Sequence, residues 1–208
     1  MIDFDSLETQ ALEQQNDSAF KHLSRRFVPG EGDNPKAFIV GEAPGAQEEM
    51  QGRPFVGPAG VMLRRLMALA SLDTEDQYDD GRDSPPTAGA NCWLTNTVKF
   101  RPPRNRTPTP QEIDAAKLYL MREWAAVGSP LIIIPVGSVA LRAILGKNIS
   151  ILKVAGQQIL KTSQITGQLM HVCPMIHTSF GLRNPDVQPI MESHWLKLAE
   201  SMEVNATY

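Results

Sequence analysis

The chain has 208 residues, of which 42% are hydrophobic and 21% are charged, as expected of one globular domain with a full core. No apolar run reaches the ~18 residues that a membrane span needs, and the acidic start of the chain lacks the Lys and Arg of a secretory signal, so we expect an intracellular, cytoplasmic protein. The two cysteines, Cys92 and Cys173, exclude a disulfide framework and a metal site built from cysteines alone. The net charge of −3, taken as a whole, argues against a generic basic nucleic-acid binder.

The charge is distributed unevenly along the chain. Residues 1–17 carry five acids and no Lys or Arg, and residues 73–83 carry six acids and one Arg, so each segment contributes −5 and the remainder carries +7. Acidic stretches that are poor in apolar residues are usually solvated. We therefore expect an acidic terminus over 1–17, an acidic inserted loop over 73–90, and a mildly basic body.

Helices and strands are predicted to alternate in the first half of the chain. An irregular apolar stripe predicts a helix over about 6–27, and an apolar run between turn signals predicts a buried strand over 36–41. A Gly- and Pro-rich segment follows, and apolar residues at helical spacing then predict a helix over 59–72. The run 92–100 predicts a second strand that leads into a basic loop.

The second half continues the alternation. Thr109, followed three residues later by Glu112, predicts a capped helix that runs to about residue 127. The next elements are a strand, a helix, a hairpin or irregular connector, a strand and a helix, over 130–136, 137–145, 151–169, 171–175 and 187–202. This order predicts the α/β class, with residues 1–208 forming a single three-layer α/β/α domain around a central four-stranded parallel sheet.

Three loops that follow predicted strands contain the residue types of an active site. Their sequences are GEAPGAQEE with GRPFVG, NTVKFRPPRNR, and HTSFGLRNP. In an open parallel sheet the loops at the carboxyl ends of the strands converge on one crevice. We therefore expect a carboxylate, an aromatic ring, an amide and an imidazole to meet there.

These loops resemble the motifs of the uracil-DNA glycosylase superfamily, and within it the bacterial and archaeal type called family four. The similarity extends over about residues 36–186. The matching segments are GEAPG at 41–45, GRPFVG with AG at 52–60, NTVKFRPPRNRTP at 96–108, and HTS with LRNP at 177–185. The resemblance implies an enzyme that flips uracil out of DNA and hydrolyses its N-glycosidic bond, leaving an abasic site for base excision repair.

The resemblance also implies how the base is bound. Phe55 would stack on the flipped uracil, Asn96 would read its hydrogen-bonding edge, and the backbone around Ala43 and Gly45 would contact the base. Each side chain has a structural alternative. Phe55 could pack on the sheet as a core residue, and Asn96 could close the end of a strand.

Two further residues are implied as catalytic. His177 would donate a hydrogen bond to the uracil O2, where negative charge develops, and it need not be protonated to do so. Glu42 would hold or activate the attacking water. The structural alternative for Glu42 is a carboxylate that caps the following loop by accepting backbone N–H groups.

The expected DNA contacts come from three segments, namely the basic run over 99–106, Ser138 after the third predicted strand, and the loop over 179–183. Four positive charges within eight residues are suited to phosphates, although such a run is often only a solvated surface. Leu182 and Arg183 would fill the gap left by the flipped nucleotide. The expected phosphate contacts are Lys99, Arg101, Arg104, Arg106, Ser138 and Ser179.

The chain departs from the family-four pattern in its cysteines. Members of that family usually carry four cysteines that bind an iron–sulfur cluster, but here the expected Cys-x-x-Cys region reads AFKHLSRRF, and the other two positions fall at Phe100 and near Ala116. We therefore expect no cluster, no other cofactor and no metal, with packing by Phe100 and the N-terminal helix in its place. Thr178 replaces the family's usual proline, which we expect to loosen that loop.

The sequence thus predicts a monomeric, monofunctional DNA glycosylase. Its partner is DNA that contains uracil or a modified base, and no membrane partner is expected. Two alternatives stay open, namely the same chemistry on another modified or damaged base, and a non-catalytic DNA-binding relative. A Rossmann-type nucleotide-binding enzyme is disfavoured because GEAPGAQ lacks the G-x-G-x-x-G spacing.

Overall fold

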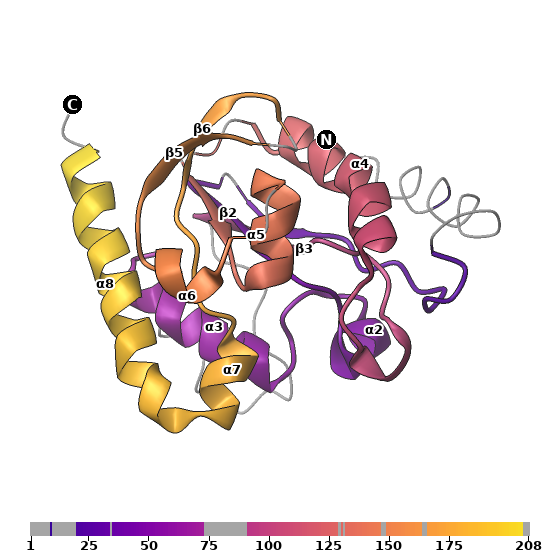
Figure 1. The fold of residues 1–208 in the computed structure, drawn as a ribbon. Helices are drawn as coiled ribbons and strands as arrows, with labels where there is room; N and C mark the ends of the chain where they lie inside the picture. The colour runs from indigo at the N-terminus through magenta and orange to yellow at the C-terminus, as the bar shows by residue number, and fades with distance from the viewer. Residues whose placement is uncertain are drawn as a thin grey trace.

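The computed structural model describes residue 9 and residues 20–33, 35–72, 91–128, 130, 132–146, 149–163 and 166–205. Six strands form one mixed sheet in the order β1-β3-β2-β4-β6-β5 (Figure 1). Their bounds are β1 Glu31–Gly32, β2 Ala37–Gly41, β3 Cys92–Asn96, β4 Ile132–Pro135, β5 Ile159–Thr162 and β6 Leu169–Val172. The four central strands run parallel, and the two edge strands run antiparallel to their neighbours.

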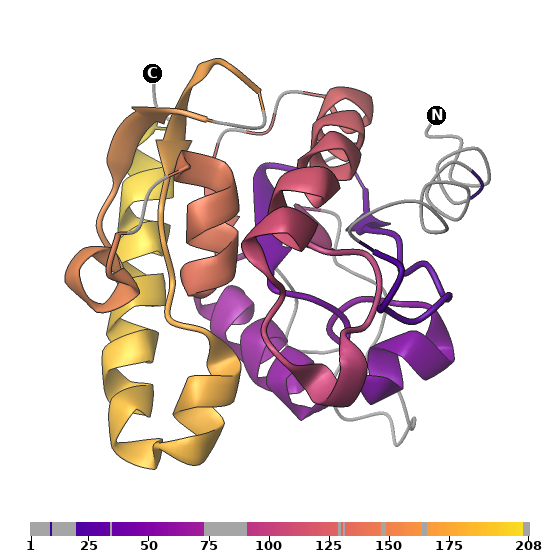
Figure 2. The same cartoon turned by 45° about the vertical axis from the view of Figure 1, so that its right-hand side comes forward.

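Helices cover both faces of this sheet. Their bounds are α2 Ala46–Gln51, α3 Pro58–Leu69, α4 Pro110–Ala126, α5 Ser138–Leu145, α6 Ile151–Val154, α7 Thr178–Arg183 and α8 Gln188–Asn205, with short 3₁₀ turns at Pro103–Asn105 (η2) and Pro185–Val187 (η3). The long helix α8 lies beside α3 in both views of the molecule (Figures 1 and 2).

The side chains of the buried strand β2 point alternately to the two faces of the sheet, and their contacts show which helices cover each face. In β2, Ile39 packs in one core with residues of α3 and α8, whereas Phe38 and Val40 pack in a second core with residues of α4 and α5. Successive side chains of a strand point to opposite faces, so a fully apolar strand can serve two cores at once. The predicted α/β/α layering with a central four-stranded parallel sheet is confirmed.

The two antiparallel edge strands were not predicted as part of the sheet. β1 has two residues, and β5 is mostly exposed, so neither has the apolar run by which the central strands were predicted. The segment predicted over 151–169 as a hairpin or irregular connector holds the short helix α6 and the strand β5, which pairs with β6 as a hairpin.

Several predicted bounds also differ from the structure. The second strand ends at Asn96, because the Thr97 N–H and hydroxyl both turn to the Gly41 carbonyl oxygen, at 2.9 and 2.8 Å. Residues 20–27 form turns and bends where a helix was predicted, and the rest of that helix lies outside the described residues, as do both acidic segments apart from residue 9.

The capped helix is confirmed, since Thr109 Oγ1 accepts from the Glu112 N–H at 3.3 Å and Glu112 Oε2 accepts from the Thr109 N–H at 2.6 Å. Among the described helices, none is long and apolar enough to cross a membrane.

Candidate active site

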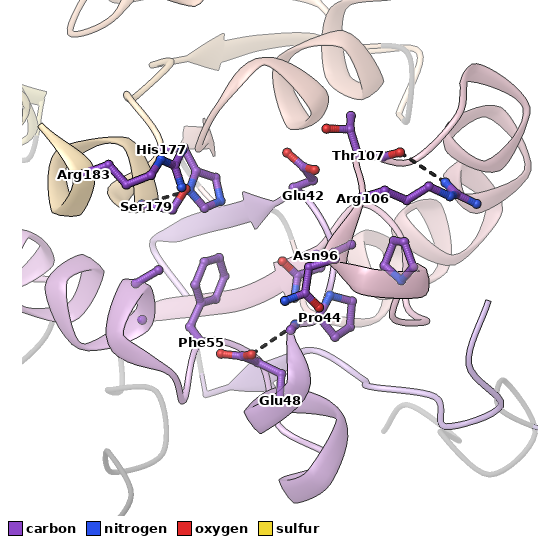
Figure 3. A pocket seen from close by; sticks show the side chains of 16 residues that line it. Glu42, Pro44, Glu48, Phe55, Asn96, Arg106, Thr107, His177, Ser179 and Arg183 are labelled. Atoms are coloured by element: carbon purple, nitrogen blue, oxygen red, sulfur yellow. Dashed lines mark hydrogen bonds between the residues drawn. The ribbon is translucent and has the colours of Figure 1, made fainter.

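A pocket of about 410 Å³ opens at the carboxyl ends of the central parallel strands. Its volume lies within the ~300–1,000 Å³ that is usual for sites of small ligands. Glu42 and Asn96 come from the ends of β2 and β3, Phe55 from the loop before α3, and His177 from the start of α7, and together they surround the pocket (Figure 3). The other lining residues are Ala43, Pro44, Gly45, Glu48, Ala59, Gly60, Pro102, Asn105, Arg106, Thr107, Ser179 and Arg183.

Phe55 and Asn96 meet over Gly41. Gly41 pairs with Asn96 across β2 and β3, and a Cβ atom at Gly41 would overlap both the Asn96 Oδ1 and the Phe55 ring. The two side chains are 5% and 4% exposed, and Phe55 has a positive φ of 55°, which is strained for a non-glycine residue. The glycine therefore makes the space in which an aromatic face and an amide lie side by side.

Glu48 holds the loop that presents Phe55. Its Oε2 accepts from the Gly45 N–H at 3.0 Å (Figure 3). Its Oε1 accepts from the Gly57 N–H at 2.7 Å, so one carboxylate joins two loops beside the pocket. The bond to Gly45 is a local one, since Glu48 is the third residue of the helix that Gly45 precedes, whereas the bond to Gly57 joins a second loop and has no counterpart in a local sequence pattern.

The protonation state of His177 follows from its surroundings. Its Nδ1 accepts from the Ser179 backbone N–H at 3.1 Å and lies 2.8 Å from the Ser179 hydroxyl oxygen. Because a backbone N–H can only donate, Nδ1 carries the lone pair, and the proton of the neutral ring lies on Nε2. Burial, assisted by the charge of Arg183, lowers the pKa of His177 to about 4, so the ring is neutral near pH 7.

Glu42 lines both this pocket and a second hollow of about 350 Å³. Burial raises the pKa of its carboxyl group above the ordinary 4.5, and a hydrogen bond with the Thr107 side chain opposes the rise. Its backbone oxygen accepts from the Val98 N–H at 3.1 Å. The carboxylate is therefore partly desolvated and fixed at the end of β2.

Lys99 is not available to DNA. It is 1% exposed, and its ammonium group lies 2.6 Å from Glu123 Oε2 on α4 and bonds to the Thr95 hydroxyl. The prediction that Lys99 contacts phosphate is wrong. Its position in a basic run suggested that it lies on the surface, but its ammonium group is buried in an ion pair with Glu123.

The other expected DNA contacts are arranged unevenly around the pocket. Arg101 pairs with Glu49 at 2.9 Å, and Arg106 pairs with Glu112 at 2.6 Å, so both charges are partly compensated. Four of the expected contacts are exposed to solvent, as contact with DNA requires, namely Arg104, Ser138, Leu182 and Arg183. Ser138 is exposed at the start of α5 and lines the second hollow, and Ser179 lines both cavities.

An aromatic core occupies the region where the family-four resemblance places the cluster cysteines. Phe100 lies 5.7 Å from Phe20 and 5.6 Å from Phe27 between ring centroids, and Tyr119 lies 6.0 Å from both of these rings. Ala116, the last expected cysteine position, is fully buried in the same apolar cluster. The segments that the four cysteines would have joined do meet in this chain, and they meet through apolar packing.

The donor atoms for a metal cluster are not brought together in the described part of the chain. Among these residues no group of three or more His, Cys, Asp or Glu could hold a metal ion. Cys92 lies on β3 and Cys173 directly follows β6, and β2 and β4 lie between them. Three strand spacings amount to about 14 Å, which is too far for two ligands of one cluster. The residues described do not fit an iron–sulfur cluster.

The chain is similar in sequence to proteins of known function. A family model described as the uracil DNA glycosylase superfamily matches residues 29–199. The chain belongs to the uracil DNA glycosylase superfamily. It is 37% identical over 166 residues to a type-4 uracil-DNA glycosylase from Thermotoga maritima, covering 78% of this chain and 76% of the relative.

Two further relatives extend the comparison. A type-4 uracil-DNA glycosylase from Saccharolobus solfataricus is 37% identical over 185 residues, covering 86% of this chain and 77% of the relative. A DNA polymerase of Bacillus phage SP01 is 30% identical over 169 residues, which cover 81% of this chain but 16% of the polymerase.

Proposed function

We propose that the protein hydrolyses the N-glycosidic bond of uracil in DNA. The observation that carries the proposal is the pocket in which Phe55 and Asn96 meet over Gly41 while Glu42 and His177 lie at its other walls. This set supplies a surface for stacking, a hydrogen-bonding edge, a carboxylate and a neutral donor, which together are what base excision by hydrolysis requires.

Recognition of the base rests on Phe55 and Asn96. Stacking of a base on an aromatic ring contributes about 1–3 kcal/mol, which helps to offset the cost of unstacking the nucleotide from the duplex. The Asn96 amide both donates and accepts, so it matches the O4 and N3–H of uracil and opposes the reversed pattern of cytosine. The backbone of Ala43 and Gly45 approaches the same space.

The chemical step rests on His177 and Glu42. As the C1′–N1 bond breaks, its electron pair leaves with the base, and the developing charge on O2 receives a hydrogen bond from His177 Nε2–H. The oxygen of a water molecule held by Glu42 forms the new bond to C1′, and its proton passes to the carboxylate. The uracil anion then takes a proton from solvent.

The DNA partner is bound through the rim of the pocket. Arg104, Arg106 and Arg183 supply positive charge for phosphates, and Ser138 and Ser179 supply hydroxyl groups. Leu182, which is 44% exposed, has the exposure needed to enter the stack that the base has left. Arg101 remains a candidate although Glu49 compensates its charge.

We further propose that the enzyme acts as a monomer inside the cell and without an iron–sulfur cluster or other cofactor. The aromatic packing of Phe20, Phe27, Phe100 and Tyr119 supports the absence of the cluster, since it fills the region between the same segments. Iron analysis and the visible absorption spectrum of the purified protein test this, because bound cluster iron would contradict it.

The activity is tested with a labelled DNA duplex that contains one uracil, incubated with the protein and then treated with alkali to cut abasic sites. We expect cleavage by the wild type, and a strong loss in Asn96→Ala and His177→Ala. Thr162→Val, an exposed change on β5, is the matched control and should cleave normally. Release of another modified base but not uracil would favour the second substrate class, and binding without release of any base would favour a non-catalytic relative.

A further inference from the structure

The side chain of Thr178 crosses between two segments that form the pocket. Its hydroxyl donates to the backbone oxygen of Ala59 at 2.7 Å, although the two residues are 119 positions apart in the chain. Thr178 is the first residue of α7 and is fully buried, and Ala59 lies in the first turn of α3. The bond therefore ties the beginning of α7 to the beginning of α3.

Both ends of this bond are next to residues that line the pocket. On α7, Thr178 stands between His177 and Ser179. On α3, Ala59 itself lines the pocket, and Gly60 lies so close to Phe55 that a Cβ atom would overlap the Phe55 carbonyl oxygen. A displacement of α3 at this point would therefore move Phe55 relative to His177.

The two helices also pack tightly one turn further along α7. A Cβ atom at Gly181 would lie 2.8 Å from Met62 Cε of α3 and 2.7 Å from Met191 Sδ of α8. This apolar contact limits how closely the helices approach, but sulfur and methyl groups do not fix a direction. The Thr178 hydrogen bond is directional and thus fixes the relative position of the two helix ends.

We propose that Thr178 is a positioning residue whose hydroxyl sets the spacing between the His177 imidazole and the Phe55 ring. This inference rests on the proposed glycosylase function. It also corrects the expectation from the sequence that a threonine at this position loosens the loop, because the hydroxyl restrains it. Phe55 holds the base by stacking, and the His177 imidazole must then reach the O2 atom of that base. A change in the spacing of the two side chains weakens the hydrogen bond to O2 in the transition state more than it weakens binding of the DNA substrate.

The test compares Thr178→Val, which keeps the shape and removes the hydroxyl, with Thr178→Ser, which keeps the hydroxyl. Single-turnover rates are measured on uracil-containing DNA, together with the enzyme concentration that gives half of the maximal rate. Thr162→Val is the control for the same chemical change on an exposed strand. We expect the Val variant to lose about 10–100-fold in single-turnover rate with little change in half-saturation, and the Ser variant to recover most of the rate.

Hydrogen exchange gives a second measurement that does not depend on activity. In Thr178→Val the amides of residues 59–62 and 177–183 should exchange faster than in the wild type, and in Thr178→Ser they should not. A Val variant with the wild-type rate, equal losses in Val and Ser, or unchanged exchange would each overturn the positioning role. If the wild type itself releases no uracil, the proposed function fails, and the exchange data alone then decide whether the hydroxyl joins the two helices.

Discussion

The ammonium group of Lys99 lies 2.6 Å from the carboxylate of Glu123, and the two side chains are each about 1% exposed. Glu123 also accepts from the Gly30 N–H at 2.9 Å and from the Thr95 hydroxyl at 2.7 Å. One carboxylate on α4 therefore holds the strand residue that precedes Asn96 and the segment that leads into β1. Burial lowers the pKa of Lys99, whereas Glu123 opposes that shift.

Removing one partner of this pair should destabilise the protein. Glu123→Ala leaves Lys99 in the interior without its anion, and such a change costs about 3–5 kcal/mol. The measurement is the free energy of unfolding in urea. The double variant Glu123→Leu with Lys99→Met should lose less than Glu123→Ala, because no unpaired charge remains buried. If the double variant is the less stable of the two, the unpaired charge is not the cause.

The dependence of DNA binding on salt should separate exposed from buried cations. Arg104 is exposed beside the pocket rim, so Arg104→Ala should reduce the slope of log K against log salt concentration by about 1. Lys99→Met should leave that slope unchanged, since Lys99 is enclosed. Lys161→Ala, an exposed change on β5, serves as the control for loss of one surface charge. A reduced slope in the folded Lys99 variant would contradict the interior assignment.

The acid limb of the pH–rate profile should report Glu42. A carboxyl group must be ionised to accept a proton from water, and burial raises the pKa of Glu42, so the rate should rise with pH through an inflection above 4.5. The inflection that belongs to His177 should lie lower, because burial lowers its pKa to about 4. The rate should rise with pH there too, because the neutral imidazole is the active form. Glu42→Gln should lose about 10²–10⁴-fold in single-turnover rate and the upper inflection with it. An unchanged profile in Glu42→Gln would exclude Glu42 as the titrating group.

The aromatic core should contribute to stability without a metal. Phe100→Ala removes a fully buried ring that contacts Phe20 and Phe27, and we expect a loss of about 3–5 kcal/mol in the free energy of unfolding. Unfolding in the presence of a strong chelator should give the same midpoint as without it. A chelator-dependent midpoint in the wild type would indicate a metal that stabilises the fold.

Local patterns predicted most of the central architecture. The strands β2, β3 and β4 are short apolar runs between turn signals, and α4 begins at the predicted Thr109–Glu112 cap, because burial and capping are decided within a few residues. The loops with Phe55, Asn96 and His177 were expected to converge for the same reason, since parallel strands present their carboxyl ends on one edge. The edge strand β1 could not be predicted, because it has two residues and pairs with β3, which is distant in the chain. β5 lies in the segment predicted as a hairpin or irregular connector, and its pairing with β6 is a local hairpin.

The basic run from Lys99 to Arg106 shows what a linear sequence leaves undecided. Four like charges within eight residues predict a phosphate-binding surface, but the structure turns Lys99 inward to Glu123 and pairs Arg106 with Glu112. The partner acids lie on α4, and no local pattern relates them to the loop. In the same way, the bond between Glu48 and the Gly57 N–H depends on how the two loops fold around the pocket.

The sequence by itself determined the family, the parallel sheet and the four residue types at the pocket, because these depend on motifs and on periodicity along the chain. It also showed, from two cysteines, that the usual cluster ligands are missing. Only the tertiary structure decided which charges face solvent, which ring nitrogen of His177 carries the proton, and that Thr178 bonds to Ala59. Those properties depend on burial and on contacts between distant segments, and both exist only once the chain has folded.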